Sequence, residues 1–103
     1  MFRALVFIAV LALVGAATTI NARAADAGRG RHLAQDHCAA CHVVTAHGRN
    51  DVAVSPPFAV IGRKYGFNAD VIAHVIAGPH PKMNFAPNRA DAADIAAYIA
   101  TLR

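Results

Sequence analysis

The chain has 103 residues, which leaves room for one small domain, and carries a formal charge of +4 at pH 7. Apart from Arg63-Lys64 its basic residues are scattered singly, and no aromatic residues alternate with them, so the composition argues against nucleic-acid binding. Much of the apolar excess lies in the first 24 residues, so the remainder is less hydrophobic than the average suggests.

Residues 1–24 have the pattern of a secretory signal peptide. Arg3 gives a positive start, an almost uninterrupted apolar run extends to Ala17, and small residues precede a cleavage point after Ala24. Cleavage there leaves one domain, residues 25–103, with eight basic residues, six aspartates and a formal charge of +2. The alternative is an uncleaved membrane anchor, but the apolar run is short for a span of about 20 residues. We expect an exported, periplasmic protein without stable membrane insertion after cleavage.

A first helix is expected from about Asp26 to His37, with Gly30, Leu33, Ala34 and His37 on one face. It leads directly into the cysteine motif of the chain. The helix therefore places that motif at its C-terminal end.

Cys38-Ala-Ala-Cys41-His42 has the C-x-x-C-H spacing of c-type haem attachment. Each sulfur adds to one vinyl group of the porphyrin, so the two thiols must lie one helical turn apart and face the ring edge. The adjacent histidine is then in position to supply an axial nitrogen to the iron. No other cysteine is present. The sequence predicts one covalently attached haem c.

Two other uses of the same residues remain open. A redox disulfide of the thioredoxin kind needs a βαβ context, and no β-branched strand run precedes this pair. A zinc site with His42 and either His37 or His47 as further ligands is the second alternative, although such sites usually draw on a distant ligand pair.

Between residues 43 and 67 no periodic pattern persists, because Pro56-Pro57, Gly62 and Gly66 interrupt the chain. We expect an ordered but irregular connection here.

Two further helices are expected after it. The second extends from Asn68, a good N-cap, to Ile76 and ends before Gly78-Pro79; its expected apolar face is Val71, Ile72, Val75 and Ile76. The third has Asn88 as its N-cap and Asp91 three residues later, followed by apolar residues at helical spacing: Ile95, Tyr98, Ile99 and Leu102. The predicted fold class is all-α, with three or more helices and ordered loops around one covalent haem.

Met83 is the only methionine besides Met1, and it lies in a proline-braced segment between the second and third helices. A thioether ligand must reach the iron from the side opposite His42, and a stiff loop can hold it there. We predict His42 and Met83 as the axial ligands of the iron. Met83 as a filler of a core gap is one alternative. His80 as the second ligand is another, but prolines on both sides of it restrict its reach.

Together these features resemble a small bacterial monohaem class I cytochrome c, over essentially the whole of residues 25–103. In that family a glycine eight residues before the first cysteine marks the crossing of the N-terminal and C-terminal helices, and Gly30 matches it. An aliphatic–aromatic pair on the last helix, matched by Ile95 and Tyr98, is the crossing partner. Where many members carry an aromatic residue on the first helix, this chain has Ala34.

The resemblance also implies a wider set of cofactor-binding residues. The family's proline, whose carbonyl accepts a hydrogen bond from the axial histidine, is matched by Pro56. Phe58 follows closely and is expected to pack on the haem. The cofactor-binding residues expected in full are Cys38, Cys41, His42, Met83, Pro56 and Phe58.

The function that the resemblance implies is one-electron transfer between transient redox protein partners, and not enzymatic catalysis. No nucleophile–base arrangement or pair of carboxylates suggests catalysis. Two alternatives stay open: a haem subunit of a larger dehydrogenase or oxidase, and a gas-binding or peroxide-reactive haem protein. Because a chain of fewer than about 80 residues rarely buries enough apolar surface unaided, we expect the haem-free protein to be largely unfolded.

Overall fold

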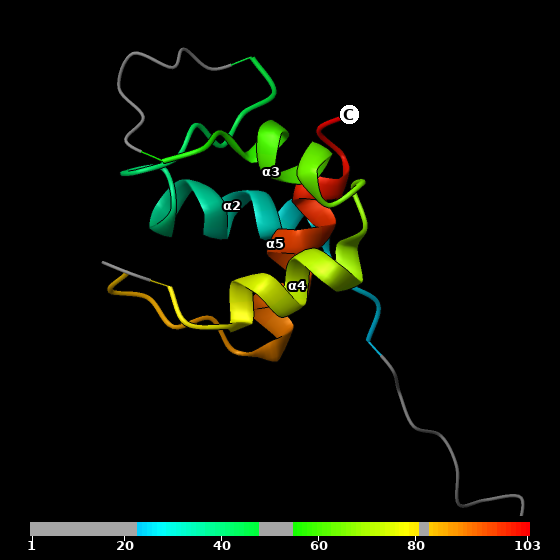
Figure 1. Cartoon of the computed structure of the whole chain (residues 1–103). Helices are drawn as coiled ribbons and strands as arrows, with labels where there is room; N and C mark the ends of the chain where they lie inside the picture. The colour runs from blue at the N-terminus through cyan, green and yellow to red at the C-terminus, as the bar shows by residue number, and fades with distance from the viewer. Residues whose placement is uncertain (1–22, 48–54, 81–82) are drawn as a thin grey trace, which may run out of the picture.

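The computed structural model describes residues 23–47, 55–80 and 83–103, and this part of the chain forms four helices and no strand (Figure 1). The helices are α2 (Ala27–His37), α3 (Phe58–Lys64), α4 (Ala69–Ala77) and α5 (Arg89–Ala100). The all-α prediction is confirmed. The predicted signal peptide falls almost wholly outside the described residues. Within them, no helix is both long and apolar enough to cross a membrane.

The three helices expected from the sequence begin directly after Asp26, Asn68 and Asn88, and the caps expected at Asn68 and Asn88 are confirmed. The Asp26 carboxylate accepts a hydrogen bond from the Arg29 amide at 2.9 Å, which caps α2. The Asn68 side chain accepts bonds from the amides of residues 70 and 71 at 3.1 and 3.2 Å. Asn88 accepts one from the Asp91 amide at 2.8 Å, as expected for α5.

Helix α3 was not predicted, so the expectation of an irregular connection over residues 43–67 was wrong in its second half. The two prolines end the preceding loop, and Pro57, with φ −57° and ψ 148°, directly precedes the first turn of α3. The helix has only seven residues, too few for its apolar spacing to stand out. It ends in a Schellman motif: Gly66 has φ 62°, and the Phe67 amide donates to the Gly62 carbonyl at 2.7 Å.

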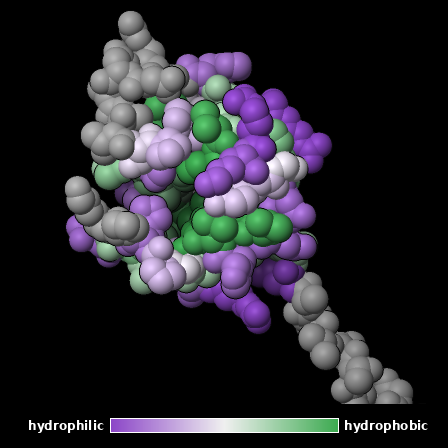
Figure 2. All heavy atoms as spheres, in the orientation of Figure 1, coloured by the Kyte–Doolittle hydropathy of each residue, from purple (hydrophilic) through white to green (hydrophobic). Residues whose placement is uncertain are grey.

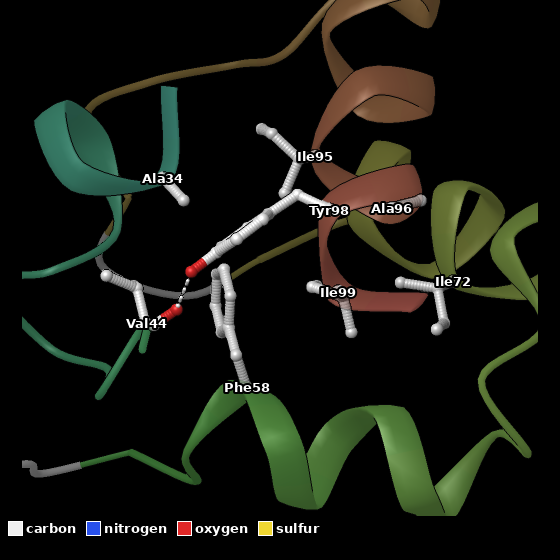
Figure 3. Close-up of a cluster of buried hydrophobic side chains, with 8 residues drawn as sticks. All are labelled: Ala34, Val44, Phe58, Ile72, Ile95, Ala96, Tyr98 and Ile99. Atoms are coloured by element: carbon white, nitrogen blue, oxygen red, sulfur yellow. Dashed lines mark hydrogen bonds between the residues drawn. The ribbon is translucent and has the colours of Figure 1, made fainter. Parts of the chain in front are cut away.

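Helix α5 is the centre of the fold and packs against α2, α4 and α3 (Figure 1). Its buried side chains include Ile95, Tyr98 and Ile99, which meet Ile72 of α4 and Phe58 of α3 in the core (Figure 3). The Tyr98 hydroxyl donates a hydrogen bond to the Val44 carbonyl at 2.6 Å. This bond anchors the segment that follows the cysteine motif to α5.

The crossing of α2 and α5 depends on Gly30. A Cβ atom at this position would overlap with the backbone carbonyl group of Asp94 and come within 2.9 Å of the Ile95 nitrogen. Only a residue without a side chain allows the two backbones to approach so closely. The predicted role of Gly30 at the helix crossing is confirmed.

The expected apolar face of α4 was only partly right. Ile72 is fully buried and Ile76 partly buried, whereas Val71 and Val75 are 43% and 42% exposed. Ile72 belongs to the core cluster that includes Ile95 and Ile99 of α5, Ile76 packs against that cluster, and Val75 lines the cavity described below. Leu102, expected on the last helix, lies beyond the end of α5.

Candidate functional site

A cavity of about 730 Å³ is lined by all six residues that the sequence nominates for cofactor binding: Cys38, Cys41, His42, Pro56, Phe58 and Met83. Figure 2 shows a hollow in the surface that faces the viewer, bordered by apolar side chains. Core residues of α4 and α5 form further walls, among them Ile72, Ile95 and Ile99. The volume lies within the range of small-molecule and cofactor sites, about 300–1,000 Å³.

The cysteine motif continues the turn at the end of α2. The Cys38 amide donates to the Ala34 carbonyl at 2.9 Å, and the Cys41 and His42 amides donate to the Cys38 carbonyl at 3.2 and 2.9 Å. The two cysteines are therefore about one turn apart and both face the cavity, as attachment to one porphyrin edge requires.

Both thiols are free and partly buried. Burial raises the pKa of the Cys38 thiol, which keeps it neutral instead of a reactive thiolate. Within the described ranges no three His, Cys, Asp or Glu side chains gather to hold a metal ion. Neither the disulfide nor the zinc interpretation gains support from this geometry.

His42 is held by the loop that precedes α3. Its Nδ1 lies 2.6 Å from the Pro56 carbonyl oxygen. Because a carbonyl can only accept, Nδ1 carries the hydrogen and Nε2 keeps its lone pair available for a metal. The Phe58 ring, 4% exposed, lies 5.4 Å from the imidazole, centre to centre. These contacts fix both the tautomer and the orientation of His42.

Two backbone hydrogen bonds keep this loop in place. The Ser55 amide donates to the Cys41 carbonyl at 3.1 Å, and the Phe58 amide donates to the Val43 carbonyl at 2.9 Å. The segment that carries His42 and the segment that carries Pro56 therefore pair on both sides of the imidazole. No feature of the sequence other than the resemblance indicated this pairing.

Met83 lies between α4 and α5, partly buried, and lines the cavity. His80 lines it too, and its ring centre is 6.1 Å from that of His42. The prolines beside His80 therefore do not keep it away from the site, in contrast to what the sequence suggested.

Sequence reasoning missed a ring stack that connects α2 to the Met83 segment. The rings of His37 and Phe85 lie 4.0 Å apart, centre to centre, with an angle of 10° between their planes. Phe85 follows Met83 by two residues and lines the cavity. The stack fastens the chain next to Met83 to α2, the helix that directly precedes Cys38.

A charged cluster at the other end of α2, in which exposed arginine side chains pair with largely buried aspartates, was also missed. The Arg29 guanidinium pairs with Asp94 at 2.8 Å and with Asp91 at 2.7 Å, and Asp94 also accepts a hydrogen bond from the Asp26 amide at 2.8 Å. Burial opposes ionisation of Asp94, but the hydrogen bonds from the Asp26 amide and Arg29, with the charges of Arg23 and Arg29, outweigh it. The pKa of Asp94 therefore lies below its usual value.

The cavity and the residues around it fit a haem c. Two thiols on one turn face a largely apolar space, and a histidine of fixed tautomer lies immediately beside them. An all-α domain with this site is a protein that holds a covalently attached haem.

Comparison with known proteins agrees with this class. A cytochrome c family profile matches residues 27–103. The chain is 44% identical to cytochrome c-552 of Bradyrhizobium diazoefficiens over 94 residues, 90% of each protein. It is 33% identical to a cytochrome c-553-like protein of Synechocystis sp. over 78 residues, 75% of this chain and 70% of that protein. No solved structure matches significantly.

The chain belongs to the cytochrome c family and is a small monohaem class I cytochrome c. It is thereby a c-type cytochrome electron carrier with a covalently attached haem c, and Cys38 and Cys41 have the spacing of the C-x-x-C-H attachment motif. The predictions of the family and of the cofactor are confirmed. The axial ligands and the cellular location stay predictions.

Proposed function

We propose that this chain is a periplasmic one-electron carrier in which His42 and Met83 are the axial ligands of the haem iron. The hydrogen bond from His42 Nδ1 to Pro56 carries the proposal, because it leaves Nε2 as the free nitrogen of a fixed ring. The bound haem supplies an iron that alternates between the ferrous and ferric states.

The surrounding residues support this role in two ways. The apolar walls of the cavity, which include Phe58 and Ile72, exclude water and favour the less charged, ferrous state. The stack of His37 on Phe85 holds the chain beside Met83 to α2. A site fixed on both sides rearranges little when the charge of the iron changes, which suits rapid electron transfer to transient protein partners.

The optical spectrum of the holoprotein, the chain with its haem attached, tests the axial ligands. His42/Met83 ligation predicts a far-red sulfur-to-iron band in the oxidised protein and no rapid reaction of the reduced protein with carbon monoxide. Rapid carbon monoxide binding without that band would overturn the proposal and favour a gas-binding or peroxide-reactive protein.

Export is tested separately, by cell fractionation and the intact mass of the holoprotein. The proposal predicts a periplasmic protein with the mass of residues 25–103 plus one haem, whose N-terminus is Ala25. A membrane-bound protein that retains residues 1–24 would contradict the proposed location, although it would leave the electron-carrier function intact.

A further inference from the structure

His42 and His80 both line the cavity, and their rings lie beside each other in an edge-on arrangement. Their ring centres are 6.1 Å apart, and their planes are inclined at 69°. Two imidazoles that share one metal ion at bond lengths of about 2 Å have ring centres roughly 6 Å apart. The backbone of α4 and the turn after it therefore already bring His80 to the separation at which it can share an iron ion with His42.

His80 and Met83 have the same surroundings. Both line the large cavity beside His42, and both also line a smaller cavity of about 220 Å³ next to it. The smaller cavity is bounded by the end of α4 and the chain that precedes α5, including Ile76, Phe85 and Pro87. Both side chains therefore border open space on the side of the cavity where the second ligand of the iron is expected.

We propose that His80 is a second axial ligand available to this chain, which binds the iron when Met83 is displaced. The inference rests on the proposed function, in which His42 is the permanent ligand on the other side. The exchange breaks the bond between the iron and Met83 Sδ and forms one between the iron and an imidazole nitrogen. No electron is transferred, and no proton is released because a neutral imidazole binds through its unprotonated nitrogen.

The consequence is a carrier with two ligation states of different potential. Methionine ligation raises the potential of a haem relative to histidine ligation, so the His80 form holds its electron less tightly. Met83 can be displaced, for example, when peroxide oxidises its sulfur to the sulfoxide. His80 then keeps the iron six-coordinate, so no coordination position is left open to gases.

The test compares Met83→Ala with Met83→Ala/His80→Ala as holoproteins. The first variant is expected to remain six-coordinate and low-spin, with a reduction potential below that of the unmodified chain. Its apparent affinity for carbon monoxide is expected to be at least about tenfold weaker than that of the double variant, because His80 leaves only a small fraction of the iron open. Met83→Ala/His74→Ala, which removes an exposed histidine of α4 instead, is expected to behave like Met83→Ala.

Equal carbon monoxide affinity in the single and double variants, with high-spin iron in both, would overturn the proposal. His80→Ala alone is expected to keep the far-red band, which shows that the substitution does not unfold the site. If the unmodified chain lacks that band and His80→Ala opens the iron to carbon monoxide, the Met83 assignment fails while His80 stands as a ligand. The two proposals can therefore fail independently.

Discussion

His42 and Pro56, fourteen positions apart in the sequence, are joined by a 2.6 Å hydrogen bond from imidazole Nδ1 to the carbonyl oxygen. Pro56→Gly keeps this carbonyl but frees its loop, so the bond should weaken and the imidazole should become a poorer donor to iron. We expect a rise in reduction potential of less than about 59 mV, the equivalent of a tenfold change for one electron. Potentiometric titration measures it.

Pro57→Gly is the matched control for this substitution. The Pro57 carbonyl accepts hydrogen bonds from the first turn of α3 and makes none to His42. This variant should lower the free energy of unfolding but leave the potential unchanged. Equal shifts of potential in both variants would mean that loop stability, and not the bond to His42, sets the potential.

Gly30→Ala should destabilise the protein because a methyl group there overlaps with the backbone of Asp94. Overpacking of this kind typically costs about 1–3 kcal/mol in the free energy of unfolding, measured by denaturant titration. Gly28→Ala in the same helix meets no backbone atom and comes within 3.3 Å only of Asp26 Oδ1, the oxygen that caps the helix, which needs to shift by no more than a few tenths of an ångström. It should be neutral or stabilising by up to about 1 kcal/mol, because alanine is the better helix former. Similar losses in both variants would contradict the helix-crossing role.

Asp94→Asn should remove the ion pair with Arg29 and lower the free energy of unfolding by about 1–3 kcal/mol at pH 7. The folded-state pKa of Asp94 lies below that of the unfolded chain, so its stabilisation is complete above the unfolded value of about 3.9. It is lost as the pH falls through the folded value. The difference between the two proteins should therefore be constant from pH 7 to about pH 4 and shrink below that.

The exposed Asp70 of α4 provides the comparison for Asp94. Asp70→Asn should change the free energy of unfolding by less than about 0.5 kcal/mol across the same pH range. A pH-independent difference between the unmodified protein and Asp94→Asn would show that the ionisation of Asp94 does not matter.

Tyr98→Phe removes the hydroxyl that donates to the Val44 carbonyl at 2.6 Å in the core. The carbonyl is then buried without its donor, and we expect a loss of about 1–3 kcal/mol in the free energy of unfolding. Tyr65→Phe, at a partly buried position on the end of α3, should cost less. Hydrogen exchange at the amides of residues 41–44 should also accelerate in Tyr98→Phe if the hydroxyl anchors that segment.

Removal of the haem should unfold most of the chain. The cavity beside His42 has a volume of about 730 Å³, and partly exposed walls such as Val75 and Ile76 lack a packing partner without the cofactor. The double variant Cys38→Ala/Cys41→Ala, produced without haem, should show far less helical circular dichroism than the holoprotein. Retention of the full helical signal would mean that α5 and its neighbours form a sufficient core alone.

The sequence could predict those parts of the fold whose physical causes are local. Asn68 and Asn88 cap the helices that they precede, as predicted, and the C-x-x-C-H spacing by itself indicates haem attachment. Gly30 was informative only through the family resemblance, since nothing local says which glycine lies at a helix crossing.

The features that escaped prediction depend on residues far apart in the chain. The pairing of Arg29 with Asp94 and the stack of His37 on Phe85 exist only once the helices have packed. Helix α3 is too short for periodicity to reveal it. His80 seemed restricted by its prolines, but the distance to His42 is set by the end of α4 and by the turn after it, not by the prolines alone.

The central claim is that this chain is an electron carrier whose iron has both axial positions occupied by protein ligands. The voltammogram of the purified holoprotein, recorded with and without carbon monoxide, tests it most directly. One reversible one-electron wave, at the same potential in both conditions, is the predicted result. A wave that moves to higher potential under carbon monoxide would contradict the account, since the gas would then be binding to the ferrous iron and stabilising it.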